Sequence, residues 1–184
     1  MHCRHASNLT VLVSVAIVVS LALGACTRPR EGYQPEQPIP FSHYKHAGQN
    51  EIACQYCHVG PAMGRHSTVP STNICMNCHR VVAIDREPIK KLTEAYDNGT
   101  PIKWVKVHDL PDHAYFDHQP HVAFFQQNVE GNTAPGKMQG VCANCHGNVD
   151  EAAVVKTENQ FNMGWCVNCH RENNAPIDCQ TCHR

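Results

Sequence analysis

The sequence predicts a mainly α-helical fold with much irregular structure, organised around bound groups rather than around a large core of side chains. Three observations lead to this fold class. The pattern Cys-x-x-Cys-His occurs five times. Once the first 25 residues are set aside, about 32 residues remain for each copy, which is too little chain to bury a large core. Short helical patterns lie between the copies, and nothing indicates a large sheet.

Each copy is the attachment signature of a c-type haem, because two thiols reach one edge of the porphyrin and the following imidazole reaches the iron. Zinc sites use such cysteine pairs two at a time, so five copies fit zinc poorly. The sequence therefore predicts a haem-cored multihaem cytochrome c with five covalently bound c-type haems, whose motif histidines are the proximal ligands. The five motifs are Cys54-Gln-Tyr-Cys57-His58, Cys75-Met-Asn-Cys78-His79, Cys142-Ala-Asn-Cys145-His146, Cys166-Val-Asn-Cys169-His170 and Cys179-Gln-Thr-Cys182-His183.

The N-terminal residues, 1–25, have the pattern of a lipoprotein-type signal peptide. A run of 17 mainly apolar or small residues ends at Ala25, and Leu23-Gly-Ala25-Cys26 resembles a lipobox. Cys26 is then predicted to be the acylated N-terminus. An uncleaved signal anchor is the alternative, because this run lies at the short edge of what spans a bilayer. Either way, we expect the chain at the periplasmic face of the cytoplasmic membrane.

A proline-interrupted segment, 26–40, follows and predicts an extended tether. The haem-binding region is expected at 41–184. It contains an imperfect repeat, 41–80 and 116–171, with one further haem motif at 179–183. Phe41-Ser-His43-Tyr-Lys-His46 stands before two motifs, and Phe116-Asp-His118-Gln-Pro-His121 stands before three.

Between the halves, Asp85–Gly99 has an apolar stripe with Pro88 in its first turn, and it predicts one amphipathic helix. The next residues, 100–110, predict a short extended piece. We expect a second short helix over 150–157.

The second axial ligand of each iron decides what the haem does, because two imidazoles close the iron and an empty position allows substrate chemistry. In Phe-x-His-x-x-His, two imidazoles three residues apart lie on one helical turn and can serve two neighbouring haems. We therefore predict four distal ligands in these segments, His43, His46, His118 and His121. For the fifth iron we predict His108, because its neighbours are apolar; His113 is the alternative, and His66 is expected to be exposed. Met138 or Met163 as a sixth ligand would give one haem of higher potential.

The composition narrows the function further. A formal net charge of −1 argues against a nucleic-acid binder. Enough histidines are present to close every iron, which favours electron transfer over catalysis, so the chain is predicted not to be an enzyme by itself. A stand-alone periplasmic electron carrier and a multihaem reductase are the alternatives, and the reductase would need an open iron.

The order of these motifs resembles the pentahaem cytochrome c subunit of bacterial alternative complex III. The most specific stretches are Trp104-Val-Lys-Val-His108-Asp-Leu-Pro-Asp112 and Met163-Gly-Trp-Cys166-Val-Asn-Cys169-His170-Arg171. Phe-x-His-x-x-His is also similar to class III multihaem cytochromes. The resemblance implies an electron-transfer subunit of a membrane quinol-oxidising complex. Its implied partners are an iron–sulfur, molybdopterin-like subunit, multispan quinol-binding membrane subunits, and a monohaem cytochrome c or terminal oxidase as acceptor.

Overall fold

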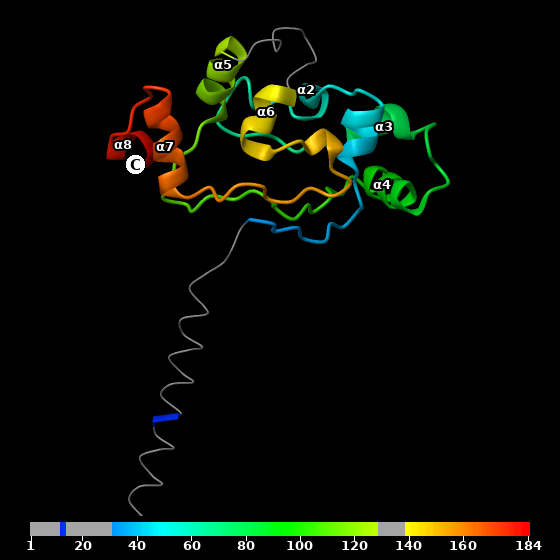
Figure 1. The fold of residues 1–184 in the computed structure, drawn as a ribbon. Helices are drawn as coiled ribbons and strands as arrows, with labels where there is room; N and C mark the ends of the chain where they lie inside the picture. Colours follow the sequence, from blue (N-terminus) through cyan, green and yellow to red (C-terminus); the bar gives the residue numbers. More distant parts are fainter. Residues whose placement is uncertain (1–11, 14–30, 129–138) are drawn as a thin grey trace, which may run out of the picture. The chain divides into compact units, whose positions relative to one another are not determined.

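Short helices carry the Cys-x-x-Cys-His motifs, and extended segments connect them (Figure 1). The computed structural model describes residues 12–13, 31–128 and 139–184. No strand occurs in these ranges, so the predicted mainly α, loop-rich fold class is confirmed. The elements in chain order are the π-helix η1 (Tyr44–Gln49), α2 (Cys54–Cys57), α3 (Thr72–His79), α4 (Glu87–Asp97), α5 (His118–Asn128), α6 (Gln139–His146), the 3₁₀-helix η2 (Val149–Glu151), α7 (Met163–Glu172) and α8 (Cys179–Cys182).

Helix α4 confirms the amphipathic helix predicted between the two halves. Proline stands in its first turn, where a missing N–H costs nothing. The chain leaves the helix through Gly99, whose φ of 64° suits a residue without a side chain. Leu92 is buried on the face that packs toward α3.

Side-chain burial is slight, as the small amount of chain per motif predicts. In the part of the chain that the structure describes, one core cluster joins Ile39, Met76 and Leu92. A second cluster joins Val122 of α5 to Val141 of α6. Both clusters lie against motif cysteines, Cys75 and Cys142 respectively, so the cores support the attachment segments.

Three extended segments, 31–40, 101–110 and 152–161, run alongside one another under the helices (Figure 1). The Gln37 side chain both donates to and accepts from the backbone of Val105, each at 2.9 Å. The backbone of Thr157 pairs with that of Gly32 and Tyr33, and its hydroxyl donates to the Val107 carbonyl at 3.0 Å. The latter part of the predicted tether is therefore packed against the haem-binding region.

The helix predicted over 150–157 is wrong. Only η2 is helical there, and the chain then runs extended. Thr157 is 2% exposed and uses its backbone N–H and carbonyl in pairing with the N-terminal segment. These tertiary hydrogen bonds override the local helical preference.

Two compact units divide the chain, Met1–Arg30 and Glu31–Arg184, and every haem motif belongs to the second. The predicted signal sequence and Cys26 lie outside the described residues. Among the helices that are described, none is long and apolar enough to cross a membrane.

Candidate haem-binding sites

The two cysteines of each motif lie on one short helix, α2, α3, α6, α7 or α8. A spacing of three residues brings both thiols to the same side of such a helix. The motif histidine lies at or just beyond the helix end in four motifs, and His170 lies in the last turn of α7. All ten motif cysteines are free thiols, so both sulfur atoms of every motif are available for thioether bonds. The residues present therefore fit covalent haem attachment.

Backbone carbonyls fix the orientation of seven candidate ligands. In each case the imidazole Nδ1 donates to a carbonyl oxygen, which leaves Nε2 as the lone-pair nitrogen that a metal needs. The pairs are His46 with Ser42 (2.8 Å), His58 with Thr68 (2.7 Å), His79 with Val82 (3.0 Å), His118 with Arg65 (2.8 Å), His121 with Asp117 (2.6 Å), His170 with Pro176 (2.6 Å) and His183 with His113 (2.8 Å).

Four proximal histidines each face a second imidazole at a separation that would accept an iron. A metal held between two imidazoles by bonds of about 2 Å keeps the ring centroids roughly 6 Å apart. The centroid separations are 6.5 Å for His43 and His58, 6.0 Å for His46 and His79, 5.9 Å for His121 and His170, and 5.7 Å for His113 and His183.

His113, the alternative to His108 for the one unassigned iron, lies beside the fifth motif, with its ring centroid 5.7 Å from that of His183. The backbone N–H of Tyr115 donates to the Cys182 carbonyl at 2.6 Å, and His183 donates to the carbonyl of His113. These bonds hold the segment around 113–115 against α8. His66 is exposed, as predicted.

The third motif has two candidate distal histidines. The ring of His108 lies edge-on to that of His146, with the ring centroids 4.4 Å apart. The Nε2 atom of His108 is buried without a hydrogen-bond partner. His118 also lies near His146. Burial first, and then the charges of His108, His118 and His58, lower the pKa of His146 to about 3. The structure brings both predicted ligands to this one site.

Burial keeps the imidazoles of His43 and His121 neutral, which is the form that binds a metal. Desolvation, followed by the neighbouring His58 and His46, lowers the pKa of His43 to about 4. Burial also lowers the pKa of His121. At neutral pH these side chains therefore present a lone pair rather than a second proton.

The two Phe-x-His-x-x-His segments build the same local arrangement. The ring centroid of Phe41 lies 4.8 Å from that of His43 and 4.4 Å from that of His46. Phe116 lies 4.8 Å and 4.5 Å from the corresponding histidines of the second segment. Each phenylalanine therefore supports a pair of imidazoles.

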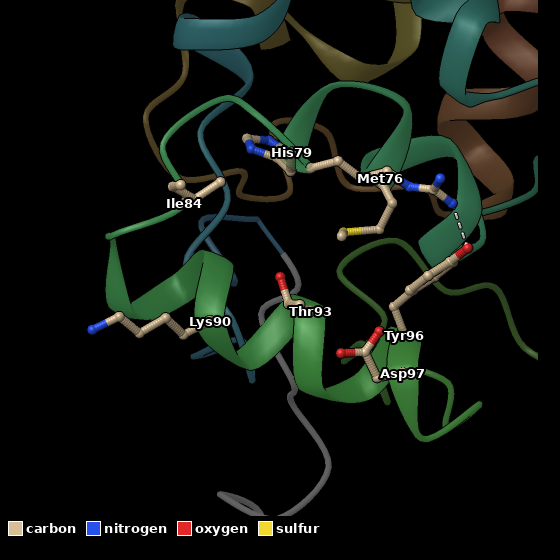
Figure 2. Close-up of a pocket in the computed structure, with 8 residues that line it drawn as sticks. Met76, His79, Ile84, Lys90, Thr93, Tyr96 and Asp97 are labelled. Atoms are coloured by element: carbon tan, nitrogen blue, oxygen red, sulfur yellow. Dashed lines mark hydrogen bonds between the residues drawn. The ribbon is translucent and has the colours of Figure 1, made fainter.

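A hollow of about 690 Å³ lies between α3 and α4, beside His79 (Figure 2). Met76 and Ile84 supply apolar surface, whereas Arg80 and Lys90 supply positive charge. The Arg80 guanidinium donates to the Tyr96 hydroxyl, which holds it at this hollow. Asp97 adds a carboxylate, so the hollow combines apolar surface with groups of both charges.

The structure describes one of the two methionines that were considered as sixth ligands. The side chain of Met163 is 70% exposed at the start of α7. Met138 lies outside the described residues. Met76 is buried, but it belongs to the core cluster with Ile39 and Leu92.

Sequence reasoning missed the carbonyl groups that orient the imidazoles. Residues as different as Thr68, Val82 and Pro176 supply them, because every residue type has a carbonyl oxygen. It also missed Arg65, whose carbonyl accepts from His118 and whose guanidinium lies 3.8 Å from the ring centroid of Tyr115. No local motif marks these roles.

Attachment motifs on short helices, bracketed by paired imidazoles in a chain with little side-chain core, define a multihaem c-type cytochrome. No family model matches the chain. It is 30% identical over 190 residues to the multihaem cytochrome c subunit of menaquinone reductase from Nitratidesulfovibrio vulgaris strain Hildenborough, covering 92% of this chain and 88% of that protein. The chain belongs to this family of multihaem cytochrome c subunits, whose haems are covalently bound.

Proposed function

We propose that this chain holds five c-type haems, each closed by two histidines, and passes single electrons within a quinone-linked membrane complex. The observation that carries the proposal is the four imidazole pairs at 5.7–6.5 Å, each formed by one motif histidine and one histidine from elsewhere. Bound haem supplies one-electron exchange at the iron. The protein holds both axial imidazoles and leaves no position for a substrate.

The proposed distal ligands follow from these pairs and from the repeat. His43 serves the first motif, His46 the second, His121 the fourth and His113 the fifth. For the third motif we assign His118, because it holds the position in its segment that His43 holds in the first. Its Nδ1 also donates to the Arg65 carbonyl, which leaves Nε2 for the metal. His108 is then a second buried imidazole beside His146.

The resemblance to the cytochrome subunit of alternative complex III supports a quinol-oxidising assembly. In it, this subunit takes electrons from an iron–sulfur, molybdopterin-like subunit beside multispan quinol-binding subunits. A monohaem cytochrome c or a terminal oxidase accepts them. Acylated Cys26 would anchor the chain at the periplasmic face of the cytoplasmic membrane, with an uncleaved N-terminal helix as the alternative.

A second candidate is the reverse direction, in which the complex delivers electrons to menaquinone. The relative from N. vulgaris favours it, because that protein is named as a subunit of a menaquinone reductase. Both directions need the same closed haems. The distinction lies in the partners and in the potentials, not in this chain's ligands.

Native purification from membranes tests the proposal, with haem content measured by mass and the co-purifying chains identified. We expect five haems per chain together with iron–sulfur and multispan membrane subunits. Adding a reduced quinol analogue to the complex should reduce the haems in the quinol-oxidising case, whereas an oxidised analogue should oxidise pre-reduced haems in the other. A cytochrome recovered alone from the soluble fraction contradicts the complex, and a haem content below five contradicts the count.

A further inference from the structure

The attachment motifs are not arranged in space in the order of the sequence. The second motif lies beside the first. The Asn77 side chain of the second donates to the Tyr56 hydroxyl of the first at 3.0 Å. These two residues lie between the cysteines of their motifs. The thiols of Cys75 and Cys78 also lie close to that of Cys57.

The first motif also touches the third. The thiols of Cys54 and Cys142 share a hydrogen bond. The carbonyl of Asp150, four residues past the third motif, lies against Gly48 of η1, the helix between His43 and the first motif. The first motif therefore contacts both the second and the third.

The third motif leads to the fourth through a row of aromatic rings. His146 lies 6.4 Å from Phe161, and Phe161 lies 5.2 Å edge-on from Trp165, which directly precedes Cys166. The side chain of Asn159 donates to the carbonyl of Cys145 at 2.7 Å. Asn159 and Phe161, which precede the fourth motif in the chain, therefore both contact the third motif.

The fourth and fifth motifs complete the row. The Cys182 thiol lies close to that of Cys166. His170 donates to the carbonyl of Pro176, in the short loop between the two motifs. In Figure 1, α3 and α8 stand at opposite ends of the row of motif helices.

We propose that the five attachment segments stand in single file in the order second, first, third, fourth and fifth. The ports for external redox partners are then the segments Cys75–His79 and Cys179–His183. This inference rests on the proposed function. Exposure supports it independently, since Cys78 and Cys179 are the exposed motif cysteines, one at each end, whereas the other eight are partly buried.

The consequence is that the first attachment segment in the chain is an inner one. A one-electron donor protein that docks at one end and an acceptor protein at the other exchange a single electron, and no bond is made or broken. Solvent and partners reach the end segments most directly. An inner segment is flanked by attachment segments on both sides, so its loss divides the row.

A matched pair of variants of the full-length holoprotein tests the order. Cys75→Ala with Cys78→Ala removes a proposed end, and Cys54→Ala with Cys57→Ala removes a proposed inner position. Redox titrations followed by NMR report the potential of each remaining haem. Because neighbouring redox groups influence each other's potential, removing the end should shift one remaining potential. Removing the inner position should shift two. The opposite result, two shifts for the second motif and one for the first, would overturn the order.

The wild-type holoprotein provides a measurement that does not depend on variant folding. Anomalous X-ray scattering at the iron edge locates each iron, and the attached motif identifies it. We expect the iron of Cys75–His79 to have that of Cys54–His58 as its only near neighbour. A first-motif iron at the end of the row contradicts the order, whereas fewer than five irons contradicts the proposed function and still leaves the order of the others readable.

Discussion

The two Phe-x-His-x-x-His segments differ in the helix that carries them but agree in how the second histidine is held. His46 lies on the π-helix η1, whereas His121 lies on the longer α-helix α5. In both, Nδ1 donates to the carbonyl four residues earlier, of Ser42 or Asp117. The centroid separations from the proximal partners are 6.0 and 5.9 Å. A local backbone hydrogen bond therefore orients this imidazole in the same way in both segments.

The first histidines of the two segments differ in how they are held. Nδ1 of His118 donates to the carbonyl of Arg65, more than fifty residues away in sequence, whereas Nδ1 of His43 is buried without a partner. The segments also stand at different distances from their motifs, with 7 residues between His46 and Cys54 but 20 between His121 and Cys142. The same Phe-x-His-x-x-His pattern therefore occurs in two different structural environments.

The largest expected effect comes from removing the second histidine of either segment. His46→Ala and His121→Ala should each turn one haem high-spin and allow the reduced protein to bind carbon monoxide, because one axial position opens. Optical and EPR spectra measure both changes. Lys45→Ala, on an exposed side chain beside His46, is the control and should leave the spectra unchanged. If only one of the two variants shows a high-spin haem, the two segments do not supply equivalent ligands.

The first histidine distinguishes the two candidates at the third motif. His118→Ala should turn one haem high-spin, as should His43→Ala, whereas His108→Ala should leave all haems low-spin. The same spectra measure this effect. If His108→Ala opens a haem and His118→Ala does not, the ligand at His146 is His108 and the two segments differ in ligation as well as in scaffold.

Arg65→Ala tests the tertiary support of the second segment. The change removes a bond to the Phe116 carbonyl and the contact with Tyr115. We expect the free energy of unfolding to fall by about 1–2 kcal/mol. The potential of the His118 haem should shift, and that of the His43 haem should not. Chemical denaturation and redox titration measure these effects, and a shift at both haems would contradict the assignment.

The smallest expected effect is a loss of stability of the same size when the phenylalanine of either segment is replaced. Phe41→Leu and Phe116→Leu should each cost about 1 kcal/mol, because each ring packs against two imidazoles at nearly the same distances. Thermal unfolding of the holoprotein compares the two variants directly. A cost confined to one of them would show that the other ring is dispensable for its pair.

Features set by neighbouring residues could be predicted from the sequence. Features that depend on contacts between distant segments of the chain could not. The helical character and the helix at Glu87–Asp97 follow from motif spacing and an apolar stripe. His113 beside His183 depends on a loop that crosses α8, which no pattern around residue 113 signals. The extended course past Glu151 is likewise set by pairing between Thr157 and the segment at 32–33, more than a hundred residues away.

The central claim is that every iron is closed by two histidines, and EPR of the fully oxidised native protein with quantitation of the spins tests it most directly. The account predicts five low-spin ferric haems per chain and no high-spin signal, with no carbon monoxide bound after reduction at neutral pH. A stoichiometric high-spin haem, or one that binds carbon monoxide without any mutation, would contradict it and would restore the case for a catalytic iron.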